Sequence, residues 1–237
     1  MRNTKIIQIL LLTNLLAVTP VFAEKLQISS SEAQVVKMTA QMGSAEAQAM
    51  LGGMYLEGNG VEKDIQKAIM WLEKSAEQNV KVRDFLFLAY YSGDLGIEKN
   101  IPRAMMWLEK SAEQGIVDAQ QKMGMFYFTG EGVEKNIPRA VKWFTKAAEQ
   151  GDIKSQYVLA GIYMDDSYGI KKNLPIAIMW LEKAANQGHS ESQYLLGLAY
   201  YLGGYGVEKN IQRAKMWIEK AANQGHTKAQ KRLAQIQ

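Results

Sequence analysis

The sequence predicts an all-α fold: a solenoid of five helix–turn–helix repeats with a capping helix at each end. The first observation is the even spacing of all five tryptophans, at 36, 36, 37 and 37 residues, in Trp71, Trp107, Trp143, Trp180 and Trp217. Columns of alanine, glycine and tyrosine recur in step with them. The second observation is that apolar residues inside each unit recur at helical spacing. Four columns in register over five units indicate an array of helix pairs.

Composition bounds the chemistry. The 237 residues are 47% hydrophobic and 22% charged, an ordinary globular ratio that excludes wholesale disorder. There is no cysteine, which excludes a disulfide framework, a thiolate metal site and a cysteine nucleophile. The formal net charge of +4 is mild, and no concentrated basic face suggests itself, so we expect no nucleic-acid partner.

Residues 1–23 read as a secretory signal peptide. Arg2 and Lys5 form a positive head, an apolar run follows from Ile6 to Val18, and small residues precede an exit after Ala23. A transmembrane anchor is the alternative, but the run is shorter than the ~20 residues that span a bilayer. We therefore expect a periplasmic or secreted protein, with no membrane insertion after cleavage.

The N-terminal cap is expected over residues 24–42, where Ser29 and Glu32 form a capping-box pattern that opens a helix to about Gln41. The C-terminal cap is expected over residues 227–237. There Ala229, Leu233 and Ala234 should point inward, while the polar side chains should meet water, namely Lys228, Lys231, Arg232 and Gln235.

The third unit shows how each repeat is built. One face of its first helix is formed by Ala119, Met123, Gly124 and Tyr127. The helix should end at the Gly130–Gly132 turn, because glycine enters left-handed backbone geometry without steric penalty. A second helix should start at an Asn136 cap, with Pro138 in its first turn. Its buried stripe is Ala140, Trp143, Ala147 and Ala148. The repeats are expected at 43–78, 79–114, 115–150, 151–187 and 188–224.

These motifs resemble one known family. From about Gly43 to His226 the chain repeats one pattern, Ala-x-x-x-Leu-Gly-x-x-Tyr followed by Gly-x-Gly-Val-x-x-Asn/Asp-x-x-x-Ala-x-x-Trp-x-x-Lys-Ala-Ala-x-Gln-Gly. This pattern resembles the Sel1-like repeats, which are relatives of the tetratricopeptide repeats. The resemblance implies a right-handed α-solenoid that serves mainly as a protein-interaction adaptor. Two units depart from it. The second has Val82 and Phe87 where the others are small, and the fourth replaces its glycine-rich turn with Asp165–Gly169.

The sequence offers little for catalysis or metal binding. His189 and His226 occupy equivalent positions of successive repeats, too far apart to share a metal, and we expect both to be solvent-exposed turn residues. No serine has a lysine three positions later, so the serine–lysine motif of β-lactam enzymes is missing. Asp165 and Asp166 are expected in a solvated turn rather than in acid/base chemistry. We expect no enzyme, no cofactor and no metal.

Two columns of the first helices remain as a candidate peptide-binding surface. One column follows the repeated tyrosine of the pattern and the other precedes that tyrosine by two residues; the tyrosines are Tyr55, Tyr90, Tyr127, Tyr163 and Tyr200. Helical geometry places the first column at the border of the buried stripe and the second column nearly opposite it. The resemblance implies that these helices line the concave face. Their large apolar members are Leu56, Leu88, Tyr91, Met125, Phe128, Met164, Leu198 and Tyr201. The alternative is that these residues only pad contacts between neighbouring helices.

The preferred hypothesis is a non-enzymatic, exported adaptor, monomeric, that binds a protein or peptide on this face. An envelope enzyme or ligand binder of the β-lactam or peptidoglycan type is the alternative. A purely structural homo-oligomer is a third possibility.

Overall fold

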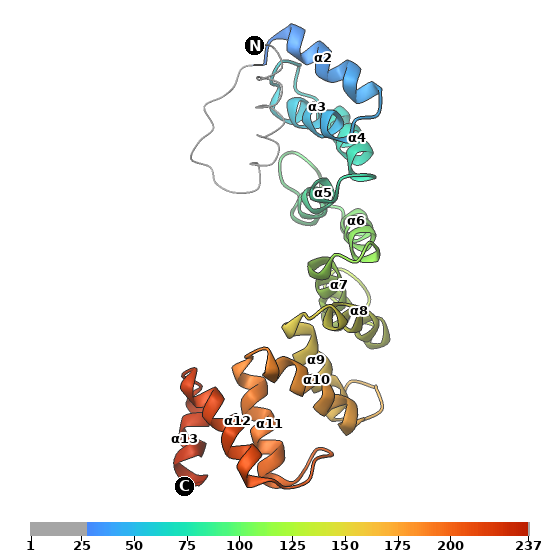
Figure 1. Cartoon of the computed structure of the whole chain (residues 1–237). Helices are drawn as coiled ribbons and strands as arrows, with labels where there is room; N and C mark the ends of the chain where they lie inside the picture. The colour runs from blue at the N-terminus through green and yellow to red at the C-terminus, as the bar shows by residue number, and fades with distance from the viewer. Residues whose placement is uncertain (1–27, 237) are drawn as a thin grey trace. The chain divides into compact units, whose positions relative to one another are not determined.

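The computed structural model describes residues 28–236, so the expected signal peptide lies outside the described residues. Figure 1 shows the helices along the chain. Their bounds are α2 (Ser30–Gln41), α3 (Ala45–Glu57), α4 (Ile65–Ala76), α5 (Val80–Ser92), α6 (Ile101–Glu113), α7 (Val117–Thr129), α8 (Ile137–Glu149), α9 (Ile153–Met164), α10 (Leu174–Asn186), α11 (Ser190–Leu202), α12 (Ile211–Asn223) and α13 (Thr227–Ile236). No strand occurs among residues 28–236. The predicted all-α class is confirmed.

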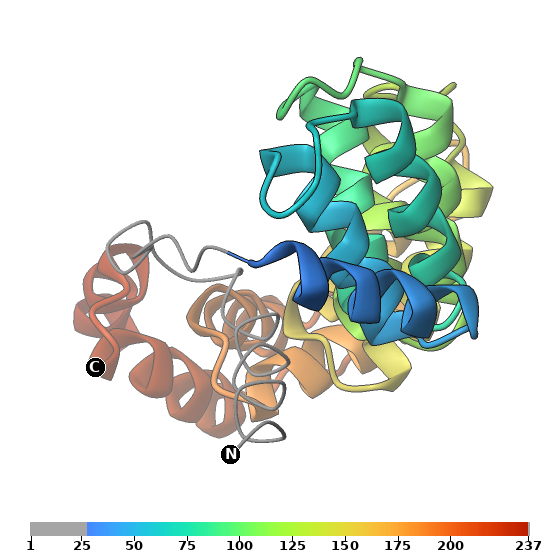
Figure 2. The same cartoon turned by 90° about the horizontal axis from the view of Figure 1, so that it is seen from above.

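The chain forms two compact units that divide within α6, after Ser111. In the first unit, α3 packs between α2 and α4, and α5 packs on α4. Figure 2 shows α2 lying along the outside of this stack. In the second unit, each helix from α7 to α13 packs on the next one in the chain. Serial packing of this kind is the stacking expected of a solenoid.

Small residues set the distance between the two helices of a repeat. A Cβ atom on Gly124 of α7 would lie 2.6 Å from the Phe144 ring of α8, and one on Gly197 of α11 would lie 2.6 Å from Ile218 of α12. The missing side chain therefore lets the backbones approach, and the large residue opposite fills the space. In the fourth repeat Ala160 holds this position, and the second repeat is the exception, because the large Phe87 of α5 takes the place of the small residue.

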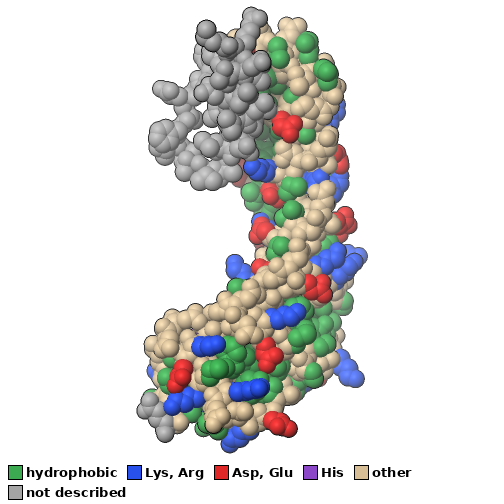
Figure 3. Space-filling model, in the orientation of Figure 1, with side chains coloured by type: hydrophobic (Ala, Val, Ile, Leu, Met, Phe, Trp, Pro, Cys, Tyr) green, Lys and Arg blue, Asp and Glu red, His purple; other side chains and the backbone are tan. Residues whose placement is uncertain are grey.

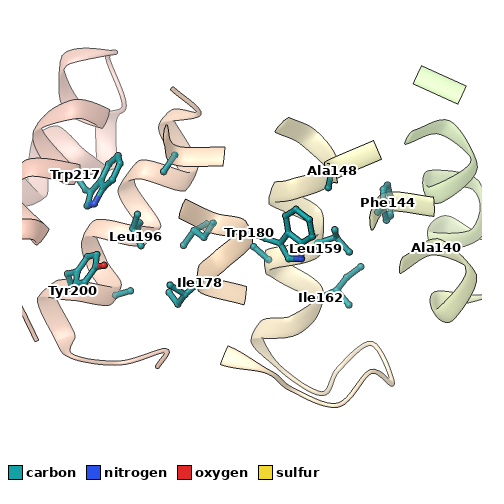
Figure 4. Packing of buried hydrophobic residues seen from close by; sticks show 14 of the residues in the cluster. Ala140, Phe144, Ala148, Leu159, Ile162, Ile178, Trp180, Leu196, Tyr200 and Trp217 are labelled. Carbon is teal, nitrogen blue, oxygen red and sulfur yellow. The ribbon is translucent and has the colours of Figure 1, made fainter. Parts of the chain in front are cut away.

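The tryptophans share one environment. All five are 2–8% exposed. The amino group of a lysine three residues later lies 4.3–4.6 Å from the centre of each indole ring, within cation–π range. Figure 4 shows Trp180 beside Leu159 and Trp217 beside Leu196, in a core cluster of the second unit. This shared environment fits the predicted role of tryptophan between helix layers.

Helix caps follow the sequence. Ser29 and Glu32 complete the capping box of α2. The Asn136 side chain accepts a hydrogen bond from the backbone N–H of Arg139, and Gly130 ends α7 in the left-handed region with φ 79°. In the fourth repeat, α9 instead ends at Asp165 in an extended conformation. This turn, in which the only glycine is Gly169, thus has its own geometry.

The C-terminal cap differs from prediction in two residues. Ala229 is fully buried and Leu233 packs beside it, as expected. Ala234 was expected inward but is exposed, because one helical turn after Ala229 the contact is made by Leu233 and then by Ile236. Arg232 was expected in water but is half-buried, since its guanidinium lies 5.7 Å from the centre of the Tyr201 ring.

Candidate functional site

The two candidate columns lie where helical geometry puts them. In the column two residues before the tyrosine, Leu88 is 58% exposed and Met125 40% exposed, while Leu198 is half-buried. A Cβ atom on Gly53 or Gly161, the glycines of this column, would meet no atom within 4 Å. The residues of the column after the tyrosine are all half-buried: Leu56, Tyr91, Phe128, Met164 and Tyr201.

Three of the eight predicted residues converge in one pocket of the second unit. Met125 and Phe128 of α7 face Met164 of α9 across a pocket of about 280 Å³. The other lining residues come from α9, the loop after it, α10 and α11: Tyr157, Val158, Ala160, Gly161, Ile162, Tyr168, Leu181 and Leu195. We call this the α7–α9–α11 pocket.

Aromatic contacts hold one wall of this pocket. The Phe128 ring lies 5.4 Å from the Tyr168 ring and 6.3 Å from the Phe144 ring, measured between centroids. Phe144 is fully buried, so it anchors Phe128 from the core side. Gly161 lies in the middle of α9 and leaves its part of the wall open. The pocket is therefore firm on the α7 side and has free space over α9.

No charged side chain lines the pocket. Among the polar groups of its lining, the Tyr157 phenol is the one influenced by a nearby charged residue. Burial raises the pKa of Tyr157, and the Glu191 carboxylate adds to this effect. Tyr157 stays neutral at physiological pH and can donate a hydrogen bond from an otherwise apolar wall. Such a lining favours an apolar guest with one acceptor.

The other five predicted residues do not join this pocket. Leu56 packs against the core of the first unit, and Tyr91 stacks on Phe87 with a centroid distance of 5.7 Å. Leu198 packs against the cluster that holds α13. Tyr201 lies under Arg232, and Leu88 remains exposed on α5. For Leu56, Leu198 and Tyr201 the contacts are those of the padding alternative.

The histidines correct an expectation. Both were expected to be exposed, but His189 and His226 are half-buried and start helices α11 and α13. His189 Nδ1 accepts the backbone N–H of Ser192 at 3.3 Å. His226 Nδ1 accepts that of Ala229 at 3.1 Å, and its Nε2 lies 2.6 Å from Glu191 Oε2. A ring nitrogen can cap a helix as an asparagine oxygen does, and the sequence reasoning overlooked this.

A buried polar column was also missed. In five repeats or caps a glutamine side chain of the first helix donates to a backbone carbonyl at the end of the preceding helix, at 3.0–3.2 Å. The residues are Gln48, Gln120, Gln156, Gln193 and Gln230. Gln150 and Gln187 extend it by donating at 2.8 Å to the Oε1 atoms of Gln120 and Gln156. The regular spacing of these glutamines was the available signal.

Groups for catalysis are not assembled among residues 28–236. No group of three or more His, Asp or Glu side chains there could hold a metal ion. Asp165 and Asp166 are exposed, and their carboxylates accept the backbone N–H groups of Ser167 and Lys172. Hydrogen bonding to the Ser167 hydroxyl and N–H lowers the pKa of Asp165, which therefore suits a turn rather than a general acid.

Comparison with known proteins decides the family. The model of the Sel1 repeat matches the chain five times, at residues 45–80, 85–116, 117–152, 153–189 and 190–226. The chain belongs to the Sel1 repeat family. Proteins of this family are generally interaction scaffolds rather than enzymes, and the predicted solenoid of repeats is confirmed. No helix within residues 28–236 has the length and hydropathy of a membrane span.

The similar proteins are longer than this chain. The Escherichia coli protective antigen c5321, with an SLR fold, is 33% identical with a TM-score of 0.64, over 88% of this chain and 44% of that one. A Sel1 repeat protein of Oxalobacter formigenes is 31% identical with a TM-score of 0.61, over 87% and 59%. The sel1-like repeat-containing protein L18 of Acanthamoeba polyphaga mimivirus is 52% identical over 46 residues, 19% of this chain and 8% of that protein. The chain thus spans less than two thirds of each.

Proposed function

We propose that this chain is a non-enzymatic scaffold that binds a peptide segment of a partner protein in the α7–α9–α11 pocket. The observation that carries the proposal is the convergence of Met125, Phe128 and Met164 on one apolar pocket of about 280 Å³. Methionines adapt to irregular guests and aromatic rings give rigid contact area, so the lining suits one large apolar side chain of a partner. The Tyr157 phenol would fix the orientation of that segment by donating to a backbone carbonyl.

Gly161 allows binding and folding to be tested separately. A leucine there would project into open space within the pocket, and replacing a helix-interior glycine raises helix propensity by up to ~1 kcal/mol. Gly161→Leu should therefore fill the pocket without unfolding the protein. The matched control is Gly53→Leu, since Gly53 occupies the same column in α3 and also faces open space.

The experiment uses a displayed library of random peptides selected on the purified chain. We expect the selected peptides to share one aromatic or large aliphatic anchor. Their dissociation constants should rise by at least about 10-fold on Gly161→Leu, because about 1.4 kcal/mol or more of contact is removed. Gly53→Leu should leave them unchanged. Peptides that bind Gly161→Leu as tightly as the unmodified chain would refute the proposal.

We also propose that the protein is exported to the periplasm or beyond, with cleavage after Ala23. Support comes from the order of positive head, apolar run and small residues in the sequence. Sequencing the N-terminus of the protein from an envelope fraction tests this. The expected first residue is Glu24, and an intact Met1 in a cytoplasmic fraction would contradict export.

A further inference from the structure

The end of the second unit is far more basic than any other part of the array. Residues 209–236 carry seven basic side chains and one acidic side chain, a balance of +6. The corresponding stretches of the earlier repeats, at 63–92, 99–129, 135–164 and 172–202, have balances of +1, +1, +3 and 0. The seven basic residues, which we call the basic end surface, are Lys209, Arg213, Lys215, Lys220, Lys228, Lys231 and Arg232.

Packing brings these charges together. Helix α13 lies along α12, with Ala229 buried between them and the Gln230 side chain donating to the Ala222 carbonyl at 3.2 Å. Six of the seven basic residues are exposed and Arg232 is half-buried. None of the seven forms an ion pair with an acidic side chain in the described part of the chain. Their charge is therefore available to a partner.

Large apolar side chains are exposed on α11, on α12 and in the loop between them, close in sequence to these basic residues. Leu202 is 63% exposed and Tyr205 44%, in the last turn of α11 and the loop that follows. Ile211 and Met216 on α12 are 42% and 41% exposed. Tyr205 also has φ 58°, in the left-handed region that disfavours residues with a Cβ atom. Lys and Arg side chains border a hydrophobic area in the lower part of Figure 3, over the second unit.

We propose that the basic end surface binds the face of an anionic lipid bilayer. Lysines near a membrane are attracted by the negative surface potential of anionic headgroups. Exposed aliphatic and tyrosine side chains next to them gain by entering the interfacial layer, where the phenol keeps its hydrogen bonds. A nucleic acid would satisfy the charges alone and leave Leu202 and Met216 in water, so the combination favours lipid. This surface is separate from the α7–α9–α11 pocket, which none of its residues lines.

The test is co-sedimentation with vesicles of phosphatidylcholine, with and without phosphatidylglycerol. The unmodified chain should bind only the anionic vesicles, and less as salt is raised. The triple variant Lys215→Gln/Lys228→Gln/Lys231→Gln should lower partitioning on the order of 100-fold, since each surface lysine contributes roughly fivefold. The matched control, Lys135→Gln/Lys142→Gln/Lys154→Gln, removes three exposed lysines of the same unit and should change partitioning far less. All variants share one N-terminus, so any contribution from residues 1–27 cancels.

A second variant, Leu202→Ser/Met216→Ser, tests the apolar part without changing charge. It should weaken binding by about the same factor in high and in low salt, because the apolar contribution is not screened, whereas the loss in the triple variant should shrink as salt is raised. If the triple variant and its control lost vesicle partitioning equally, net charge alone would explain the binding, and the assignment of the basic end surface would be wrong. So would binding of a short DNA duplex in preference to anionic vesicles, or vesicle binding that the triple variant retains in full.

Discussion

In the third repeat, α7 and α8 meet across Gly124, and the fully buried Phe144 ring fills the space opposite. In the second repeat the position of that glycine is held by Phe87, which is 5% exposed and stacks on Tyr91. The Phe87 ring occupies room that Gly124 leaves free in the third repeat, so the two repeats fill this space differently. One repeat thus buries its aromatic ring from the second helix and the other from the first.

The same pair of repeats differs in its buried polar group. Gln120 donates to the Ala112 carbonyl in the third repeat, whereas Arg83 in the second donates from Nε to the Ala76 carbonyl at 2.5 Å and from Nη2 to the Glu77 carbonyl at 2.8 Å. A guanidinium reaches two carbonyls with a fixed fork, where an amide reaches one. The repeat thus requires a filled volume between its helices and a hydrogen-bond donor for the backbone carbonyls at the end of the preceding helix, and several residue types can meet each requirement.

The largest expected effect comes from truncating the aromatic residue of the second repeat. Phe87→Ala removes a buried ring from the core of the second repeat and leaves a cavity. We expect a loss of about 3–5 kcal/mol in the free energy of unfolding. Urea unfolding followed by tryptophan fluorescence measures it. A loss below ~1 kcal/mol would mean that neighbouring side chains close the cavity, and that Phe87 is not needed to fill this space.

Adding a side chain at the glycine of the third repeat should lower the free energy of unfolding somewhat less. Gly124→Ala puts a Cβ atom 2.6 Å from the Phe144 ring, so overpacking should lower the free energy of unfolding by about 1–3 kcal/mol. The control is Gly161→Ala, a helix-interior glycine with open space around its Cα, which should be neutral or stabilising by up to ~1 kcal/mol. If both changes shift the urea midpoint in the same direction, close helix approach is not the reason for Gly124.

Exchanging the polar groups should have a smaller effect. Arg83→Gln can restore the bond to the Ala76 carbonyl but leaves Glu77 without its Nη2 donor. We expect a loss of about 1–2 kcal/mol, the net value of a hydrogen bond from a charged group. Arg83→Ala should cost more, because it leaves the buried Ala76 carbonyl unsatisfied as well. The two midpoints in urea decide whether arginine and glutamine are equivalent here; equal midpoints for Arg83→Gln and the unmodified chain would show that they are.

The smallest expected effect concerns the residue that caps the N-terminus of the first helix in the second and fifth repeats. Asn79 caps α5 and cannot titrate, whereas His189 caps α11 through Nδ1. Burial lowers the pKa of His189, against a smaller opposing effect of Glu191. A lowered folded-state pKa means that the unfolded chain takes up the proton first, so stability contributed by neutral His189 is lost as pH falls below about 6.5.

His189→Asn should remove this part of the pH dependence, about 0.5–1 kcal/mol between pH 7.5 and 5.5, the size of a helix cap. Thermal unfolding at the two pH values measures the difference. The pair of His226 with Glu191 is present in both proteins, so its contribution cancels in the comparison. An unchanged pH dependence in the variant would show that His189 does not titrate with folding.

The sequence alone determined the helices, because their signals are local. Capping residues such as Asn136, stop glycines such as Gly130 and the five tryptophans act within one repeat, and the same pattern five times over leaves little doubt about the array. Phe87 stood out from sequence as well, but its consequence, a ring buried from the first helix of the repeat that stacks on Tyr91, depends on how side chains fit between helices.

Only the tertiary structure decided which exposed or half-buried side chains meet. Met125 and Met164 lie 39 residues apart and share a pocket, while Leu198, in the same column as Met125, packs against α13. His226 is half-buried and its Nε2 atom lies 2.6 Å from Glu191 of α11, while α12 and α13, which carry six of the seven residues of the basic end surface, pack side by side. Such contacts depend on side-chain size and on the distance between helices, which no periodicity in the sequence records.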